Sequence, residues 1–350
     1  MVDDRPQPAP RGHPHERADH LYRLHQNGVT TVFDHHASYG EIPGSLLRSR
    51  TRRRRRGAHL PVLRGVRPRR RGKDAPGREG ERRFHRLLQK DKTDMVKGMM
   101  GLHASFTLSD ATLALCRENT PADAGFHIHV AEGMTDVYDS LKKYGKRVIN
   151  RLFDNDILGE KTITGHCIHV NGTEMDILKE TNTMVVHNPE SNMGNAVGCP
   201  PTMEMIHRGL TVGLGTDGYT NDMYESMKAA NCLHKHNLCD PTAAWSEVPY
   251  MLFEGNPAIG ARFFEKKLGA LEPGAAADII VTDYDPLTPL SADNVNGHTL
   301  FGMSGRQTVT TVIDGKVRMK DRELVGIDER EVLAKSREQA EKMWARINAR

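Results

Sequence analysis

The chain has 350 residues, of which 37% are hydrophobic and 27% charged, a composition typical of a globular protein. The sequence has no apolar run of about 18 residues, which excludes a membrane-spanning helix, and no basic start followed by an apolar stretch, which argues against a signal peptide. The five cysteines are scattered without a C-x-x-C pair, which favours a reducing compartment. We therefore expect a cytoplasmic protein.

The formal net charge of +4 hides a strongly uneven distribution. Residues 48–86 contain sixteen Arg and one Lys against three acidic residues, a local charge of +14, so the remainder is acidic. Three interpretations are open: a nucleic-acid-binding segment, a solvated disordered insertion, or a stretch translated out of frame. One aromatic residue, Phe84, is too few for base stacking, so we do not expect a nucleic-acid partner.

Apolar segments alternate with helical patterns through the middle of the chain. Alternation at this spacing predicts βαβ units and a parallel sheet, as in a (β/α)₈ barrel. The helices are expected near residues 109–118 (with Ser109 as N-cap), 135–153, 174–180 and 202–208. The strands are expected at Val29–Asp34, Val96–His103, Gly125–Glu132, Lys161–Val170, Thr183–Pro189 and Thr211–Asp217.

The alternation ends near Phe264, and a small all-β unit follows. Ala277–Asp283 and Thr308–Val317 have strand character, with a hairpin turn at Asp314-Gly315, and residues 329–350 predict a charged terminal helix. The expected domains are an N-terminal remnant with barrel strand 2 (1–44), the Arg-rich segment (45–87), a barrel (88–265), part of a β-sandwich (266–327) and a C-terminal helix (328–350).

Five successive strands finish in a residue capable of metal binding or proton transfer. Each such residue alone has a structural interpretation, as a core histidine or a helix cap. The repeated placement favours a functional site, because parallel barrels carry their chemistry at the carboxyl ends of the strands. The residues are His103, His129 with Glu132, His166, His187 and Asp217.

Several motifs in the same order resemble the amidohydrolase superfamily, in its cytosine/guanine deaminase and triazine-chlorohydrolase-like branch. The resemblance covers residues 28–44 and about 90 to the end, and is greatest to the selenium-metabolism-associated aminohydrolases (SsnA type). The motifs are Thr30-Thr-Val-Phe-Asp-His-His-Ala-Ser, Gly101-Leu-His-Ala, His129-Val-Ala-Glu, Gly165-His-Cys-Ile-His, His187-Asn-Pro-Glu-Ser-Asn, Gly215-Thr-Asp-Gly and Leu268-Gly-Ala-Leu-Glu-Pro-Gly.

The resemblance implies a metal-dependent aminohydrolase that hydrolyses a non-peptide C–N bond in an N-heterocyclic or amidine-like small molecule. The cofactor would be one divalent metal, zinc or alternatively iron, activating a water molecule. His129 and Asp217 would be metal ligands, and Glu132, His166 and Asp217 would be catalytic. His103 and His187 would contact the substrate.

The family's first-strand H-x-H pair of ligands has no clear counterpart. The other histidines are not expected to replace it: His13 and His15 flank a proline, His127 is expected to be structural and His169 to pack, and His234 and His236 are expected to be solvated on a helix. His35 and His36 are expected near the rim of the site. The barrel is therefore expected to be incomplete at its N-terminal units, with impaired metal binding.

Three alternatives stay open from sequence. The chain could be a cyclic-amide hydrolase of the same superfamily, an Arg-rich nucleic-acid-binding protein on a degenerate barrel, or an inactive remnant. The spacing of Glu132 three residues after His129 favours the deaminase-like reaction. A homo-oligomer is compatible with the sequence.

Overall fold

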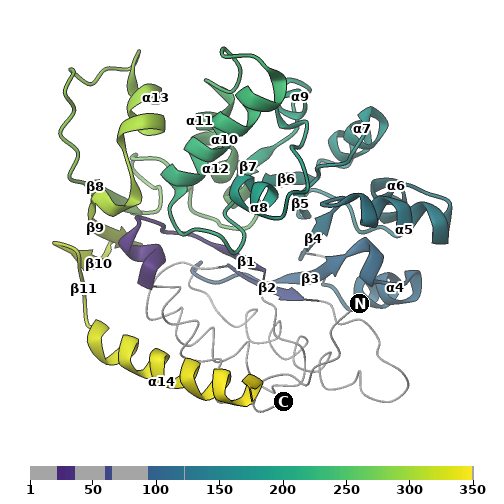
Figure 1. The fold of residues 1–350 in the computed structure, drawn as a ribbon, viewed down its shortest axis with the longest axis horizontal. Coiled ribbons are helices and arrows are strands. Elements are labelled where there is room, and N and C mark those ends of the chain that lie inside the picture. Colours follow the sequence, from purple (N-terminus) through teal and green to yellow (C-terminus); the bar gives the residue numbers. More distant parts are fainter. Residues whose placement is uncertain (1–21, 36–59, 65–93, 122, 349–350) are drawn as a thin grey trace.

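The computed structural model describes residues 22–35, 60–64, 94–121 and 123–348. Within these ranges the strands form two sheets, a seven-stranded parallel sheet and a four-stranded antiparallel one. Helices flank the parallel sheet, and the small sheet lies at its side, followed by a long terminal helix (Figure 1). The expected partial barrel with a sandwich portion and a C-terminal helix is confirmed.

The parallel sheet runs in sequence order from β1 to β7, each strand paired with the next. Among the described strands, β1 and β7 each have one neighbour, so the ladder is open where a first barrel strand would lie. β2 falls within the Arg-rich segment, whose other residues lie outside the described ranges. The strands are β1 (Phe33–His35), β2 (Leu60–Arg64), β3 (Met99–Ala104), β4 (Phe126–Val130), β5 (Ile163–His166), β6 (Met184–His187) and β7 (Val212–Leu214).

The helices follow the expected order, with short 3₁₀ and π turns between some of them. Ser109 is the N-cap of α4, as the sequence predicts, and its side chain accepts a hydrogen bond from the backbone N–H of Thr112. Residues 22–26 are helical, and the labelled α-helices are α4 (Asp110–Glu118), α5 (Met134–Tyr144), α6 (Val148–Asp154), α7 (Gly172–Glu180), α8 (Pro189–Gly194), α9 (Thr202–His207), α10 (Met223–Leu238), α11 (Glu247–Tyr250), α12 (Asn256–Ala261), α13 (Val295–Gly297) and α14 (Glu329–Asn348).

Two sequence expectations need correction. The single helix expected over 135–153 is two helices, because Gly145 adopts a left-handed conformation with φ of 67° and ends α5. The strands are shorter than expected. β5, for instance, ends at His166, whose φ of 70° no strand can continue.

The starts of the barrel strands are apolar and their ends polar, and this polarity positions the site. Met99, Ile163 and Met184 are fully buried at the starts of β3, β5 and β6, where they pack in one cluster with Ile259 and Phe264. A larger core cluster fills the space between the sheet and its helices. The polar side chains therefore collect at the opposite, carboxyl edge of the sheet.

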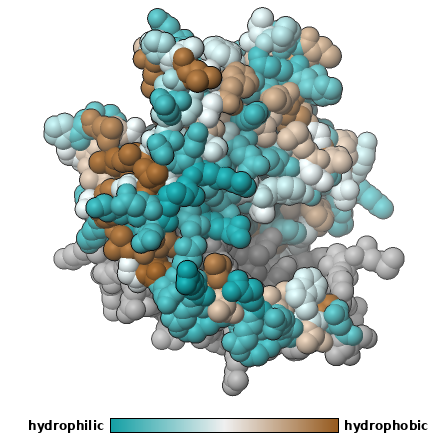
Figure 2. All heavy atoms as spheres, turned by 60° about the vertical axis from the view of Figure 1, so that its left-hand side comes forward, coloured by the Kyte–Doolittle hydropathy of each residue, from teal (hydrophilic) through white to brown (hydrophobic). Residues whose placement is uncertain are grey.

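The small sheet has the order β11-β10-β9-β8, built from β8 (Ile279–Thr282), β9 (Thr308–Ile313), β10 (Lys316–Lys320) and β11 (Glu323–Leu324). The β9–β10 hairpin turns at Asp314 and Gly315, both with positive φ, as expected. Ile279 and Val281 of β8 are exposed on one face, and Figure 2 shows hydrophobic side chains gathered on this side of the molecule.

The terminal helix α14 is attached to the small sheet. Met319 and Leu324 pack with Tyr22, and Gln26 donates a hydrogen bond to Glu329 at the start of α14.

Among the described residues, no helix has both the length and the apolar character that a membrane span needs.

Candidate active site

The ends of β3, β4 and β5 bring three histidines together. The ring centroids of His103 and His129 lie 5.8 Å apart, and those of His129 and His166 lie 5.4 Å apart in a stacked arrangement. His129 donates from Nδ1 to the carbonyl oxygen of His103 at 2.8 Å. This bond leaves Nε2 as the nitrogen of His129 that can serve as a ligand.

His35 and His127 extend this histidine cluster. The ring centroid of His35 lies 4.4 Å from that of His129, in a stacked arrangement, and 4.5 Å from that of His127. His127 and His129 share a face of β4. Burial and the neighbouring His129 and His166 lower the pKa of His127 to about 3. A neutral His127 is consistent with the structural role expected for it.

His166 occupies the centre of the expected catalytic residues. Its Nε2 lies 3.7 Å from Oδ2 of Asp217 and 3.9 Å from Oε2 of Glu132. Ser191 donates to Oδ2 of Asp217 at 2.7 Å, and Asn195 donates to Oε1 of Glu132 at 3.3 Å. The three residues expected to be catalytic therefore converge, and both carboxylates are held by hydrogen bonds from one segment.

Four residues at the carboxyl ends of the parallel strands have left-handed backbone conformations. These are Ala131 (φ 45°) after β4, His166 (φ 70°) and Cys167 (φ 49°) at the end of β5, and Asp217 (φ 48°) after β7. A non-glycine residue in this region stores strain, and strained residues cluster where a side chain must be aimed for function. The strained backbone at these positions supports a functional site at the carboxyl edge of the parallel sheet.

Asn192 connects two of the expected site residues, although the sequence did not single it out for a role. Its Oδ1 lies 2.8 Å from Nδ1 of His166, and its Nδ2 lies 3.4 Å from Nδ1 of His187. The signal available in the sequence was its position in the motif that begins at His187. His187 is fully buried at the end of β6, and its Nε2 lies 3.2 Å from Nε2 of His234.

The solvated role expected for His234 is wrong. His234 lies on α10, as expected, but only 1% of its surface is exposed, because it faces His187 and Cys199. Burial lowers the pKa of His234 to about 4. His236, two residues along the helix, is exposed.

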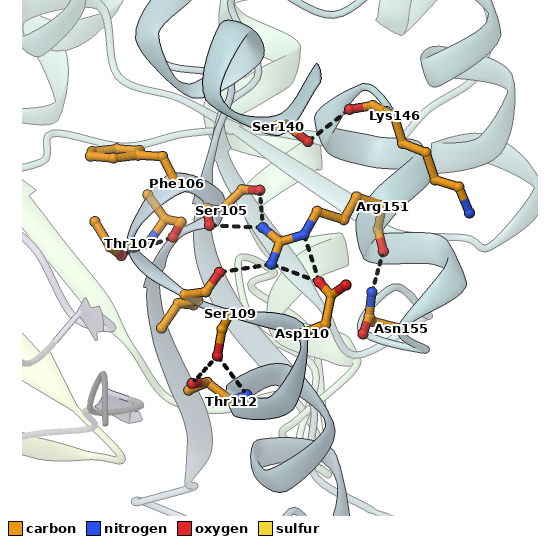
Figure 3. Close-up of polar contacts among 12 residues, drawn as sticks. Ser105, Phe106, Thr107, Ser109, Asp110, Thr112, Ser140, Lys146, Arg151 and Asn155 are labelled. Atoms are coloured by element: carbon orange, nitrogen blue, oxygen red, sulfur yellow. Dashed lines mark hydrogen bonds and ion pairs between the residues drawn. The ribbon is translucent and has the colours of Figure 1, made fainter. Parts of the chain in front are cut away.

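A buried arginine anchors the loop that follows His103. Arg151 of α6 donates to the carbonyl oxygens of Ser105 and Leu108 and to the side chain of Asp110 (Figure 3). Its guanidinium also lies over the Tyr144 ring. These bonds fix the turn between β3 and α4, and with it the end of β3.

A buried aspartate joins the loops after β3 and β4. Asp136 accepts hydrogen bonds from the backbone N–H groups of Phe106 and Ala131, and burial raises its pKa to about 6. The loop that follows His103 is thereby tied to the loop that carries Glu132.

The side chains at the carboxyl edge of the parallel sheet supply only part of the ligand set that a divalent metal needs. His129 and Asp217 are a nitrogen and an oxygen ligand of the kinds that zinc prefers. Among the described residues, however, no group of three or more His, Cys, Asp or Glu side chains is placed to hold a metal ion. His13, His15 and His36 lie outside the described ranges. All five cysteines are free of disulfide bonds.

The sequence matches one family model and curated proteins of related kind. Residues 19–318 match the model described as amidohydrolase family. A 5'-deoxyadenosine deaminase of Methanosarcina mazei is 35% identical over 279 residues, and the match covers 78% of this chain and 63% of that protein. A 5-methylthioadenosine/S-adenosylhomocysteine deaminase of Syntrophomonas wolfei is 35% identical over 70% of this chain and 58% of its own length. The chain thus spans less than two thirds of these relatives.

Solved structures share the fold. An adenosine deaminase from Xanthomonas campestris with bound zinc superimposes with a TM-score of 0.82 at 21% identity, covering 97% of this chain and 77% of that one. A mutant of atrazine chlorohydrolase TrzN from Arthrobacter aurescens, complexed with zinc and atraton, superimposes with a TM-score of 0.77 at 18% identity, covering 95% and 77%.

Proposed function

The chain belongs to the amidohydrolase family, and on that premise we propose that its carboxyl-edge site is that of an aminohydrolase. The reaction adds water to a ring carbon and releases the exocyclic amino group as ammonia. The observation that carries this proposal is the convergence of Glu132 and Asp217 on Nε2 of His166, at 3.9 and 3.7 Å.

The proposed substrate class is adenosine-like nucleosides. The relatives at 35% identity are named as deaminases of 5'-deoxyadenosine and of 5-methylthioadenosine or S-adenosylhomocysteine. His103 stands at the end of β3 beside the expected catalytic residues, where it could contact the ring of such a substrate. A substrate contact for His187 stays a prediction, and its complete burial points to a different role.

Each expected catalytic residue has a defined task in this proposal. Glu132, on the loop after β4, takes the proton from the attacking water and delivers it to the leaving nitrogen. Asp217 accepts a hydrogen bond from Ser191, which orients its carboxylate toward the same water. His166 presents Nε2 between the two carboxylates, where it accepts a hydrogen bond from the attacking water and polarises that water.

A divalent metal, zinc in the proposal, would supply Lewis-acid activation of the water when bound. His129 and Asp217 are the residues proposed to hold it. Two protein ligands bind zinc more weakly than the three or four of typical sites, so we propose that activity depends on added metal.

The rival within the family is hydrolysis of a cyclic amide, which would open a ring without releasing ammonia.

Nucleic-acid binding by residues 45–86 would act outside the described site, and its signature is an affinity for nucleic acid that falls steeply as the salt concentration rises.

The test is ammonia release by the purified chain with excess zinc, from 5'-deoxyadenosine, adenosine, hydantoin and dihydrouracil in parallel. We expect ammonia from the nucleosides and loss of activity on chelation. Ring opening of the cyclic amides without ammonia from the nucleosides would replace this proposal with its rival.

A further inference from the structure

A continuous chain of polar contacts leads from His166 away from the carboxyl edge into the protein. Asn192 lies 2.8 Å from His166 and 3.4 Å from His187, and His187 lies 3.2 Å from His234. Nδ1 of His234 lies 3.4 Å from Sγ of Cys199, which lies 3.7 Å from the carbonyl oxygen of Pro200. We call these four residues behind His166, namely Asn192, His187, His234 and Cys199, the back chain.

The direction of each hydrogen bond in this chain follows from the amide of Asn192. Oδ1 can only accept, so Nδ1 of His166 carries a proton; Nδ2 can only donate, so Nδ1 of His187 carries none. A neutral His187 then has its proton on Nε2 and donates to Nε2 of His234. His234 in turn donates from Nδ1 to Cys199, whose thiol donates to the Pro200 carbonyl.

Burial keeps every ionisable member of the back chain neutral, as this pattern requires. His187 and His234 are 0% and 1% exposed, and burial lowers the pKa of both. Burial raises the pKa of the Cys199 thiol to about 11, so the thiol keeps its proton and does not act as a nucleophile.

We propose that the back chain consists of positioning residues that hold His166 with its proton on Nδ1, so that the lone pair of Nε2 faces Glu132 and Asp217. The part that this tautomer plays in catalysis rests on the proposed aminohydrolase function. The tautomer itself does not, and it can be measured in a chain without activity.

The distances from Nε2 of His166 to the two carboxylates favour this arrangement of protons in the back chain over the reversed one. If the Asn192 amide were turned over, every proton in the chain would shift and His166 would carry its proton on Nε2. A protonated Nε2 would draw a carboxylate to about 2.8 Å. The nearest carboxylate oxygens instead lie at 3.7 and 3.9 Å, beyond hydrogen-bond distance.

The direct test is nitrogen NMR of the full chain with ¹⁵N-labelled histidine, in which a protonated and an unprotonated ring nitrogen have well-separated shifts. The His166 signals are assigned by their loss in His166→Asn. We expect a protonated Nδ1 and an unprotonated Nε2. A protonated Nε2 with an unprotonated Nδ1 would overturn the proposal.

Matched substitutions of His234 test whether the effect is transmitted along the back chain. His234→Met removes the acceptor of the His187 proton, whereas His234→Gln supplies a carbonyl oxygen in its place. We expect His234→Met to shift the His166 tautomer and to lower kcat by about 10- to 100-fold with little change in KM. His234→Gln should recover the Nδ1-protonated signal and most of the activity.

Two controls separate positioning from general damage. His236→Met changes an exposed residue of the same helix and should leave both the His166 signals and kcat unchanged. Thermal unfolding verifies that His234→Met folds. An unaltered His166 tautomer in folded His234→Met would refute transmission along the back chain, whether or not the chain proves to be a deaminase.

Discussion

The residues of the site divide into those that face the carboxyl edge and those buried behind it. Glu132 and Asp217 keep 30% and 35% of their side chains exposed, which suits groups that exchange protons with water and substrate. His187 and His234 are buried and neutral, which suits groups that orient their neighbours. Burial thus assigns different roles to residues of the same chemical type.

The buried His234 makes stability depend on pH. Its pKa falls from an ordinary value of 6.5 to about 4 in the folded state, so its contribution is present above pH 6.5 and is lost as the pH falls toward 4. Between pH 7 and 5 we expect this histidine alone to remove about 2 kcal/mol from the free energy of unfolding.

The comparison that checks this is urea unfolding of the unchanged chain and of His234→Gln at both pH values. The variant should lose less stability on acidification, because glutamine does not titrate. An equal loss in the two proteins would show that His234 is not protonated on unfolding in this range. Asp136, with a pKa raised to about 6, acts in the opposite direction in both proteins.

Sequence reasoning found the residues at the strand ends but missed those behind them. His129, Glu132, His166 and Asp217 could be predicted because each follows an apolar strand at a fixed place. The burial of His234 could not, because it depends on contacts across 47 residues between α10 and the end of β6. A local pattern on a helix contains no information about what packs against that helix.

At the scale of elements, the link between β3 and α4 depends on one side chain from α6. Arg151 is 1% exposed and donates to two backbone carbonyl oxygens and to Asp110, whose side chain is 51% exposed (Figure 3). The turn it holds begins at Ser105, two residues after His103. An element distant in sequence therefore supports the end of a strand that carries a site residue.

Removing the Arg151 guanidinium should lower the free energy of unfolding. Arg151→Met leaves the buried carbonyl oxygen of Leu108 without its side-chain donor, and the Ser105 carbonyl oxygen keeps only the backbone N–H of Leu108. We therefore expect a loss of about 1–3 kcal/mol in the free energy of unfolding. Arg151→Lys keeps the charge but cannot reach all the acceptors, so its free energy of unfolding should lie between those of Arg151→Met and the unchanged chain. Arg208→Met, which breaks a surface ion pair with Glu204, is the control and should have a far smaller effect. Equal losses at both sites would contradict the role of Arg151.

Elements with strong local signals were predicted well. The α4 N-cap at Ser109 and the β9–β10 turn at Asp314-Gly315 depend on neighbouring residues alone, and both are confirmed. The burial of Arg151 was not predicted, because a charged side chain is ordinarily exposed and its acceptors lie more than 40 residues away.

At the scale of the whole molecule, the open strand ladder and the incomplete set of metal ligands are related features of the described residues. The described parallel sheet begins at the strand that the sequence identified as barrel strand 2. The resemblance implies that two further metal ligands belong to the strand before it. Asp217 follows β7, one of the two strands that would flank that first barrel strand, whereas His129 lies near the end of β4 in the middle of the sheet.

We therefore expect the chain to bind zinc weakly. After expression with zinc and desalting, metal analysis should find well under one zinc per chain. A version extended by an N-terminal strand that carries H-x-H should retain stoichiometric zinc. Stoichiometric zinc in the unextended chain would show that residues outside the described ranges complete the site.

The central claim is that the convergent carboxyl-edge residues form an aminohydrolase site, and the most direct measurement is the zinc-saturated rate of ammonia release from 5'-deoxyadenosine by the unchanged chain and by Glu132→Gln. Glutamine preserves the shape but cannot carry the proton, so the account predicts a fall in kcat of about 100-fold or more. Glu323→Gln, at the exposed position of β11, should retain the full rate. Equal rates for Glu132→Gln and the unchanged chain, or no ammonia from either, would contradict the claim.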